Sequence, residues 1–382
     1  MVVHGGGPTA VLNASLAGVI AGSHQARCRL LAAHFGVAGL IGGDWIDLTD
    51  LPPDTVEGIR RAPGSVIGSS RRKLDSAEIE SAICRLDESR IGILLFTGGN
   101  GSMQTALEFE RCARTLDSPL RVVGIPKTVD NDLTVTDHTP GYGSAARFYA
   151  LAVRDIGLDN RALPTPVTVI EIIGRNAGWV TAATALARHY SDEAPHLIYV
   201  PERPPTLDRI CERVAEIYAR LGRVVVAACE GLRDPEGTTF GADMDRPGLR
   251  RQELAMNLGY TLARAIASHT GLRTRSEKPG LLGRSCSLAV SEIDREEAYR
   301  CGFDAIVAAH RGETGVMVAL RRAGASPYRC ETFLAPLDQV AGVERVIPND
   351  WIAPAGDDIV PEFLDYVRPL VGSIDSYVRL SG

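Results

Sequence analysis

The sequence has almost no lysine: of its 41 basic residues, only Lys73, Lys127 and Lys278 are lysines. Its eight cysteines form no CxxC pair and no cluster with histidine, which argues against a disulfide framework and a zinc site. It also lacks an apolar run long enough to cross a bilayer, and a charged segment followed by an apolar core. We therefore expect a protein of the reduced cytoplasm.

Positive charge is not in excess, since 41 basic residues face 47 acidic ones and the net charge is −6 at pH 7. This balance does not favour nucleic acid or an anionic membrane as a partner. The hydrophobic fraction of 45% is typical of a globular protein, and 382 residues suffice for two domains that each bury a core.

Short apolar runs rich in β-branched residues recur along the chain, and glycine-rich turns follow most of them. The runs are Ile91–Phe96, Leu120–Ile125, Val167–Ile173 and Val224–Ala228, and the helical segments include 13–21, 103–113, 178–188 and 252–268. Because these runs do not alternate with polar residues, they predict parallel sheets covered on both faces by helices. The pattern indicates two doubly wound α/β units. A stretch rich in Gly, Asp, Pro and Arg, 234–251, predicts a long surface loop.

Two glycine-rich turns could hold phosphate groups. His4–Thr9 leads into one helical segment, and Gly98–Ser102 opens another. Glycine lets the backbone approach an anion closely, and a helix N-terminus offers N–H groups and the positive end of a dipole. Neither turn has the spacing of a dinucleotide-binding or Walker A motif. Tight packing is the more common explanation for either turn taken alone.

A third turn, Gly124–Asp132, is more specific. It places Asp130 and Asp132 beside Lys127 and Thr128 at the end of a buried strand. Phosphoryl transfer requires a proton acceptor for the attacking hydroxyl, a magnesium ligand, and cations for the transferring oxygens. A solvated turn explains the Asp-Asn-Asp sequence equally well, because these residues are also good turn formers. The residues alone leave both interpretations open.

The chain resembles the 6-phosphofructokinase family in the content and the order of its motifs. Pro126–Asp132 and Gly98–Ser102 resemble the two signature loops of that family. Other similar segments are Gly64–Arg71, Thr136–Ala146, Glu171–Trp179, Glu230, Trp351–Ile352 and Tyr366–Gly372. The last two resemble the C-terminal segment of the longer, non-allosteric branch, whose members use ATP or pyrophosphate. The resemblance implies transfer of a phosphoryl group to the C1 hydroxyl of fructose 6-phosphate with Mg²⁺.

The resemblance also implies a role for each matching residue. Asp130 would accept the proton of the attacking hydroxyl, assisted in catalysis by Lys127, Thr128 and Arg175. The donor phosphates would be held by Gly6, Gly7, Arg71, Gly99, Asn100, Gly101 and Ser102. The sugar phosphate would be held by Gly174, Arg175, Glu230, Arg275 and Arg284, and Mg²⁺ by Asp132 and Asn100. Arginine suits this task because its planar fork binds phosphate bidentately.

The fold implied by the resemblance is a pair of doubly wound Rossmann-like domains with the active site in the cleft between them. The expected donor-binding domain comprises residues 1–141 and roughly 284–335, and the expected sugar-phosphate domain comprises roughly 142–283 and 336–382. Arg275 would reach across a subunit interface, so we expect a homo-oligomer, either a dimer or a tetramer.

The residue at position 101 bears on the identity of the donor. In the family, glycine here leaves room for the α-phosphate of a nucleotide, whereas aspartate marks pyrophosphate enzymes. Gly101 therefore favours ATP. Lys127 favours pyrophosphate, although some ATP-using members of the longer branch also carry this lysine. We expect ATP, with pyrophosphate as the alternative, because the missing side chain is what would admit the α-phosphate.

Several residues depart from the family pattern. Asn100 replaces an aspartate near Mg²⁺, which removes a full charge from a hard-cation site. On the acceptor side, an arginine of the family is replaced by Pro166, a polar residue by Leu281 and a glutamine by Gly283. The acceptor side is therefore less polar than in the family, so a different sugar phosphate or sugar-like acceptor is an alternative. Asn100 also raises the alternative of a catalytically silent regulatory subunit. Leu16 and Ile20 stand where regulated members have effector-binding arginines.

Overall fold

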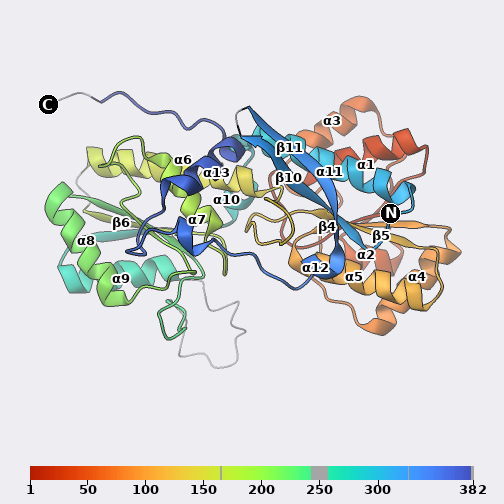
Figure 1. The fold of residues 1–382 in the computed structure, drawn as a ribbon, viewed down its shortest axis with the longest axis horizontal. Coiled ribbons are helices and arrows are strands. Elements are labelled where there is room, and N and C mark those ends of the chain that lie inside the picture. The colour runs from red at the N-terminus through yellow and green to blue at the C-terminus, as the bar shows by residue number, and fades with distance from the viewer. Residues whose placement is uncertain (164–165, 242–256, 326, 380–382) are drawn as a thin grey trace. The chain divides into compact units, whose positions relative to one another are not determined.

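Two separate sheets divide the chain into two units. The computed structural model describes residues 1–163, 166–241, 257–325 and 327–379. Unit 1 comprises Met1–Ser144 and Arg284–Arg345, and unit 2 comprises Ala145–Gly283 and Val346–Gly382 (Figure 1). The last boundary lies after Arg345 rather than near 335, since the Arg345 side chain donates to the carbonyl oxygens of Asn131 and Thr136 in unit 1.

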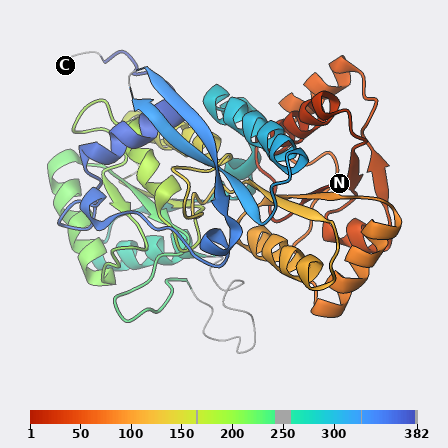
Figure 2. The ribbon, with the colours of Figure 1, turned by 45° about the vertical axis from the view of Figure 1, so that its right-hand side comes forward.

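Unit 1 contains a seven-stranded sheet in the order β11-β10-β5-β4-β1-β2-β3. Its strands are β1 (Val2–His4), β2 (Leu31–Ala33), β3 (Trp45–Asp47), β4 (Ile93–Gly98), β5 (Arg121–Pro126), β10 (Val316–Ala325) and β11 (Tyr328–Pro336). Its helices are α1 (Leu12–Ala26), α2 (Val37–Gly42), α3 (Pro53–Arg61), α4 (Ser76–Glu88), α5 (Asn100–Thr115), α11 (Glu292–His310) and α12 (Leu337–Val340), with a 3-10 turn at Ser287–Ala289. The β1, β4 and β5 strands are parallel, whereas the β2–β3 pair is antiparallel. The β10–β11 hairpin, drawn in blue in Figure 2, is also antiparallel.

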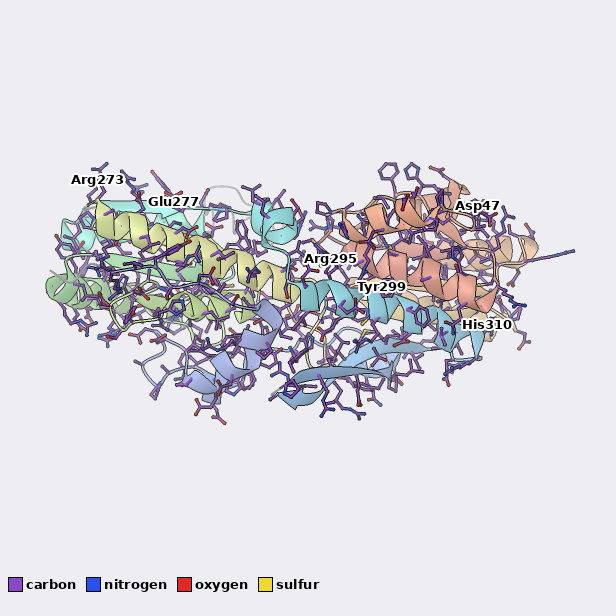
Figure 3. The ribbon with its side chains drawn as sticks, turned by 90° about the horizontal axis from the view of Figure 1, so that it is seen from above. Asp47, Arg273, Glu277, Arg295, Tyr299 and His310 are labelled. Carbon is purple, nitrogen blue, oxygen red and sulfur yellow. The ribbon has the colours of Figure 1, made fainter. Side chains whose placement is uncertain are left out.

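Side chains alternate between two cores in unit 1. Leu94 and Phe96 of β4 pack with Met103 and Phe109 of α5, whereas Leu95 packs in the opposite core, which includes residues of α1 and α11. This alternation follows from the two-residue period of a strand. On the side of α1, Arg60 of α3 lies over Tyr299 of α11, 4.9 Å from the ring centroid, and Figure 3 shows Tyr299 on that helix. The sheet is therefore covered on both faces.

Unit 2 contains a parallel four-stranded sheet in the order β7-β8-β6-β9. Its elements are β6 (Val167–Ile172), α7 (Trp179–Ala183), a 3-10 turn (Thr184–Ala187), β7 (Leu197–Tyr199), α8 (Leu207–Leu221), β8 (Val224–Cys229), α9 (Leu258–Thr270), β9 (Thr274–Glu277), a second 3-10 turn (Asn349–Trp351) and α13 (Pro361–Val371). Helices α6 (Tyr142–Ala162) and α10 (Leu281–Ser285) each begin in one unit and end in the other. Trp179 packs edge-on against Trp351, with ring centroids 6.0 Å apart.

The predicted α/β class with parallel sheets is confirmed, with local corrections. The segment 178–188 is a short α-helix followed by a 3-10 turn rather than one helix. Unit 1 has a mixed sheet, because the β10–β11 hairpin and the β2–β3 pair are antiparallel. Much of the predicted loop at 234–251, and the start of the helix predicted at 252–268, lie outside the described residues. Among the described residues, no helix is both long and apolar enough to cross a membrane.

Candidate active site

Three predicted turns of unit 1 lie at one edge of its sheet. Strands β1, β4 and β5 are neighbours, with His4 opposite Thr97 and Gly98 opposite Pro126. Because the strands are parallel, their carboxyl ends lie at the same edge. The turns that follow them are Gly5–Gly7, Gly99–Ser102 and Lys127–Asp132. The structure therefore brings together the glycine-rich turns and the acidic loop that the sequence singled out.

Lys127 ties the first turn to the third. Its ammonium group donates to the carbonyl oxygens of Gly5 at 2.9 Å and Gly7 at 2.8 Å. Burial lowers the pKa of Lys127 to about 8, an effect that the nearby Asp130 carboxylate partly offsets. An ammonium has three hydrogens, and these two bonds use two of them, so one is available for a phosphate oxygen.

Two arginines lie against Gly7. A Cβ built on Gly7 would lie 2.7 Å from Nη1 of Arg284 and 3.2 Å from Nη2 of Arg71. A side chain at this position would displace the guanidinium groups. Together with Lys127, they make a cradle of three cations around a backbone turn, which suits a highly charged anion such as a polyphosphate. Arg284 was expected on the sugar phosphate, and in the structure it lies beside a donor glycine of unit 1.

Ser102 closes the second turn onto the first. Its Oγ lies only 2.2 Å from a Cβ built on Gly5 and 2.0 Å from one built on Gly98. The Ser102 Cβ is also only 2.3 Å from the one built on Gly98, so position 98 requires glycine, whereas a side chain at position 5 would force the Ser102 hydroxyl to turn away. Gly101 differs, because a Cβ built there meets nothing within 4 Å. Gly99 and Gly101 lie at the N-terminus of the 16-residue helix α5, where backbone N–H groups can bind an anion. Packing does not explain the glycine at position 101.

The acidic loop is held by Asn131, a residue that the sequence analysis did not single out. Asn131 is fully buried and has a positive φ of 54°, a conformation that asparagine tolerates better than most residues. Its Oδ1 accepts a hydrogen bond from the Thr139 amide at 3.0 Å. Thr139 Oγ1 donates to the Thr128 carbonyl at 2.9 Å, and the Asp130 amide donates to Thr128 Oγ1 at 3.1 Å. These bonds fix the backbone on both sides of Asp130.

Asp132 and Asn100 offer oxygen atoms that suit a hard cation. Asn100 Nδ2 donates to the Asp132 carbonyl oxygen at 3.3 Å, which places the two side chains next to each other. Asp132 Oδ1 and Asn100 Oδ1 are buried and have no hydrogen-bond partner among the described residues. Carboxylate and amide oxygens are the ligands that Mg²⁺ prefers in proteins. The two predicted metal residues therefore fit Mg²⁺.

Two buried carboxylates of α11 support the segment that follows the acidic loop. Asp294 accepts hydrogen bonds from the amides of Gly141 at 2.8 Å and Ser144 at 2.9 Å, and burial raises its pKa to about 6. Glu297 bonds His138 Nε2 at 2.6 Å and accepts a hydrogen bond from Tyr328 at 2.6 Å. Burial by itself would raise the pKa of Glu297, but these bonds hold it below its usual value.

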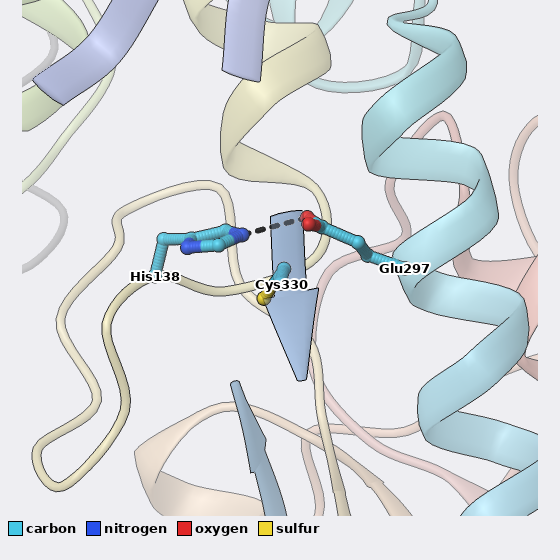
Figure 4. A group of neighbouring side chains, drawn as sticks. All are labelled: His138, Glu297 and Cys330. Carbon is cyan, nitrogen blue, oxygen red and sulfur yellow. Dashed lines mark hydrogen bonds and ion pairs between the residues drawn. The ribbon is translucent and has the colours of Figure 1, made fainter. Parts of the chain in front are cut away.

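His138, Glu297 and Cys330 lie close enough together to be considered as metal ligands (Figure 4). Both Glu297 oxygens are already used in bonds to His138 and Tyr328, however, and within this group only His138 Nδ1 is buried without a hydrogen-bond partner among the described residues. We assign it a structural role.

We expect Glu297→Gln to lower the free energy of unfolding by about 2 to 3 kcal/mol, because it replaces a buried charged acceptor. Urea denaturation measures this change. Glu296→Gln is the matched control, since Glu296 is exposed and pairs with Arg60 at the surface; it should cost less than about 1 kcal/mol. Equal losses in the two variants would show that the buried pair does not support the fold.

Three predicted sugar-phosphate residues of unit 2, Gly174, Arg175 and Glu230, lie at the carboxyl ends of β6 and β8, where Ile172 lies opposite Cys229. Glu230 Oε1 accepts hydrogen bonds from the amides of Gly174 and Arg175, both at 3.3 Å. Arg175 has a positive φ of 49°, and its carbonyl oxygen packs so tightly on Gly231 that a Cβ there would lie 1.4 Å from it. The Gly174–Arg175 turn is thus built by Glu230 and Gly231.

Arg275 is not brought to this turn within its own chain. It lies on β9 opposite Thr168, near the start of β6, whereas the Gly174–Arg175 turn follows the end of that strand. The side chain is exposed. This placement is compatible with the expected role in a neighbouring subunit, which stays a prediction.

Comparisons with known proteins extend over both units. The Phosphofructokinase family model matches residues 1–309. The chain is 38% identical to the pyrophosphate–fructose 6-phosphate 1-phosphotransferase of Rhodospirillum rubrum, over 97% of this chain and 94% of that protein. It is 33% identical to the sulfofructose kinase of Alkalicoccus urumqiensis, over 91% and 90% of the two chains. Its structure is similar to that of the pyrophosphate-dependent phosphofructokinase from Marinobacter aquaeolei, with a TM-score of 0.88 and 30% identity, covering 100% of this chain and 93% of the other.

Proposed function

The chain belongs to the phosphofructokinase family and is a phosphotransferase that acts on a sugar-phosphate hydroxyl, and from this premise we propose pyrophosphate as its donor and fructose 6-phosphate as its acceptor. The observation that carries the proposal is the cradle of Lys127, Arg71 and Arg284 around Gly7, next to the Asp130 loop. Pyrophosphate is small and highly charged, and three cations at one turn match it. The 38% identity to a pyrophosphate-dependent relative supports the same donor.

In the proposed reaction, the Asp130 carboxylate takes the proton of the acceptor's 1-hydroxyl. The hydroxyl oxygen bonds the nearer phosphorus of pyrophosphate, the bridging P–O bond breaks, and inorganic phosphate leaves. Lys127 and Thr128 hold the oxygens of the transferring group, where negative charge is spread in the transition state. The amides of Gly7, Gly99 and Gly101, together with the guanidinium of Arg71, bind the donor phosphates. Gly6 and Ser102 shape the two turns, because their amides donate to the carbonyl oxygens of Ser70 and Gly99.

Mg²⁺ would be held by Asp132 and Asn100, and when bound it would neutralise charge on the donor oxygens. In unit 2, the guanidinium of Arg175 would bind the sugar phosphate, Gly174 would shape the turn that carries it, and Glu230 would accept hydrogen bonds from sugar hydroxyls. Arg275 would act in a neighbouring subunit, so we also propose a homo-oligomer, a dimer or a tetramer. Sedimentation equilibrium tests the oligomeric state.

Purified protein with fructose 6-phosphate and Mg²⁺, supplied with pyrophosphate or with ATP, tests the donor. We expect fructose 1,6-bisphosphate to form with pyrophosphate at a higher kcat/KM than with ATP. ATP is the second candidate, because Gly101 has open space where a nucleotide α-phosphate could lie. Turnover with ATP alone would reject the pyrophosphate proposal, and no turnover with either donor would reject the acceptor as well.

Gly101→Asp separates the two donors. The open space at Gly101 accepts a side chain without displacing a neighbour, so we expect the variant to fold as the wild type does. The new carboxylate would repel and block an α-phosphate, lowering kcat/KM for ATP by more than about tenfold and leaving the value for pyrophosphate within about threefold. Parallel assays with both donors measure the ratio. An unchanged ratio would mean that position 101 does not face the donor.

A second acceptor is favoured by the apolar residues on the acceptor side. Leu281 is 69% exposed, and Gly283 offers no side chain to a sugar phosphate. The similarity to a sulfofructose kinase makes sulfofructose the first compound to test besides fructose 6-phosphate. Measuring kcat/KM for both compounds with the preferred donor decides between them, and a higher value for sulfofructose would replace our proposed acceptor.

A further inference from the structure

The acceptor side of unit 2 contains a fully buried tyrosine, Tyr149 of α6, that has no role in the proposed mechanism. Its ring fills the space where a side chain of residue 283 would lie. A Cβ built on Gly283 would be 2.3 Å from Cε2 of Tyr149, 2.5 Å from Cζ and 2.6 Å from the hydroxyl oxygen. Glycine at 283 and tyrosine at 149 are therefore matched, because neither position can gain volume without loss at the other.

The hydroxyl of Tyr149 lies beside two turns that carry acceptor-binding residues. It donates a hydrogen bond to the Gly280 carbonyl at 3.3 Å, and burial raises the pKa of Tyr149, an effect that the nearby Ile173 backbone partly offsets. Ile173 directly precedes Gly174 and Arg175, and Gly280 directly precedes Leu281. Since the hydroxyl donates to a backbone carbonyl and the side chain is fully buried, Tyr149 acts through the backbone of these turns rather than by touching a substrate.

We infer that Tyr149 is a positioning residue of the acceptor site, whose ring replaces the side chain missing at Gly283 and whose hydroxyl holds the Gly280 turn beside the backbone that leads into Gly174 and Arg175. The inference rests on the proposed function, because Arg175 is assigned to the acceptor there. It accounts for the departure at Gly283 noted in the sequence: the volume of the family's glutamine is not left empty but is taken by a residue of a different helix.

Tyr149→Phe removes the hydroxyl and keeps the ring, so the variant should fold. We expect the KM for the sugar phosphate to rise about five- to tenfold, because the Gly280 carbonyl loses its partner and the turns beside Tyr149 loosen. We expect kcat, and the KM for the phosphoryl donor, to stay within about twofold, since the donor turns lie in unit 1. A general loss of stability would lower the active fraction, and with it kcat, without this selective rise. Equal effects on both KM values, or none, would overturn the inference.

A double-mutant cycle provides an independent test. Gly283→Gln should raise the sugar-phosphate KM more than Tyr149→Phe does, because the glutamine side chain clashes with the Tyr149 ring. Adding Tyr149→Val to Gly283→Gln should bring the KM most of the way back to the wild-type value, because the smaller valine leaves room for the glutamine. Additive effects of the two substitutions would contradict the proposed match. Turnover by the wild type distinguishes failure of this inference from failure of the proposed function. If the wild type is active and the Tyr149→Phe variant is unaffected, only the role of Tyr149 is rejected. If the wild type neither binds nor converts fructose 6-phosphate, the proposed function is rejected as well.

Discussion

Asp130→Asn should lower kcat about a thousandfold and leave the KM values for both substrates within about threefold, because a general base acts on the chemical step rather than on binding. Asparagine has nearly the shape of aspartate and keeps the loop backbone, in which the Asp130 amide donates to Thr128 Oγ1. What it lacks is an oxygen able to take the proton of the acceptor hydroxyl. Steady-state kinetics with saturating donor and acceptor measure the change.

The matched control for this substitution is Asp117→Asn, which makes the same chemical change at an exposed carboxylate of unit 1. It should retain wild-type kcat. Thermal melting of both variants should stay near that of the wild type, which separates lost chemistry from lost folding. An Asp130→Asn variant with more than about a tenth of wild-type kcat would show that another group accepts the proton.

Lys127→Met should lower kcat/KM for the phosphoryl donor by about a hundred- to a thousandfold, the usual cost of removing one preorganised donor from a site where charge develops. Methionine keeps the length and apolar contacts of the buried side chain but leaves the carbonyl oxygens of Gly5 and Gly7 without the ammonium. The turn then loses both its anchor and its cation. Donor binding, measured by calorimetry with pyrophosphate and Mg²⁺, should weaken in parallel, whereas the KM for the sugar phosphate should change little.

Lys73→Met serves as the control, because Lys73 is an exposed lysine of the same unit. Its donor KM should match that of the wild type. If Lys127→Met weakened the binding of the acceptor as much as that of the donor, Lys127 would not be specific to the donor site, and the cradle around Gly7 would need another explanation.

The sequence was a good guide to the turns of unit 1, for a physical reason. Gly98–Ser102 and Lys127–Asp132 follow strands that are apolar throughout, and parallel neighbouring strands necessarily bring such turns to one edge. The same logic located Gly174 and Glu230, which follow the paired strands β6 and β8. Local patterns decided these features, so they could be predicted before any tertiary contact was known.

Other features depend on contacts between distant parts of the chain. The position of Arg284 beside Gly7, and of the Tyr149 ring beside Gly283, is set by how α6 and α10 pack, which no local pattern reveals. The β10–β11 hairpin was not anticipated, because its apolar stretch, Val316–Leu320, continues into the half-exposed stretch Arg321–Ala325. Family resemblance supplied residue roles but not a decision on the donor, since Gly101 and Lys127 favour different donors.

A crystal structure with pyrophosphate and Mg²⁺ would test the central claim most directly. We predict one phosphate within hydrogen-bonding distance of Lys127 Nζ and of the guanidinium groups of Arg71 and Arg284, with Asp132 and Asn100 facing the metal and Asp130 facing the other side of the transferring phosphorus. Pyrophosphate bound without contact to the Gly5–Gly7 turn, or with Asp130 directed away from it, would contradict the assignment of this edge of the sheet as the donor site.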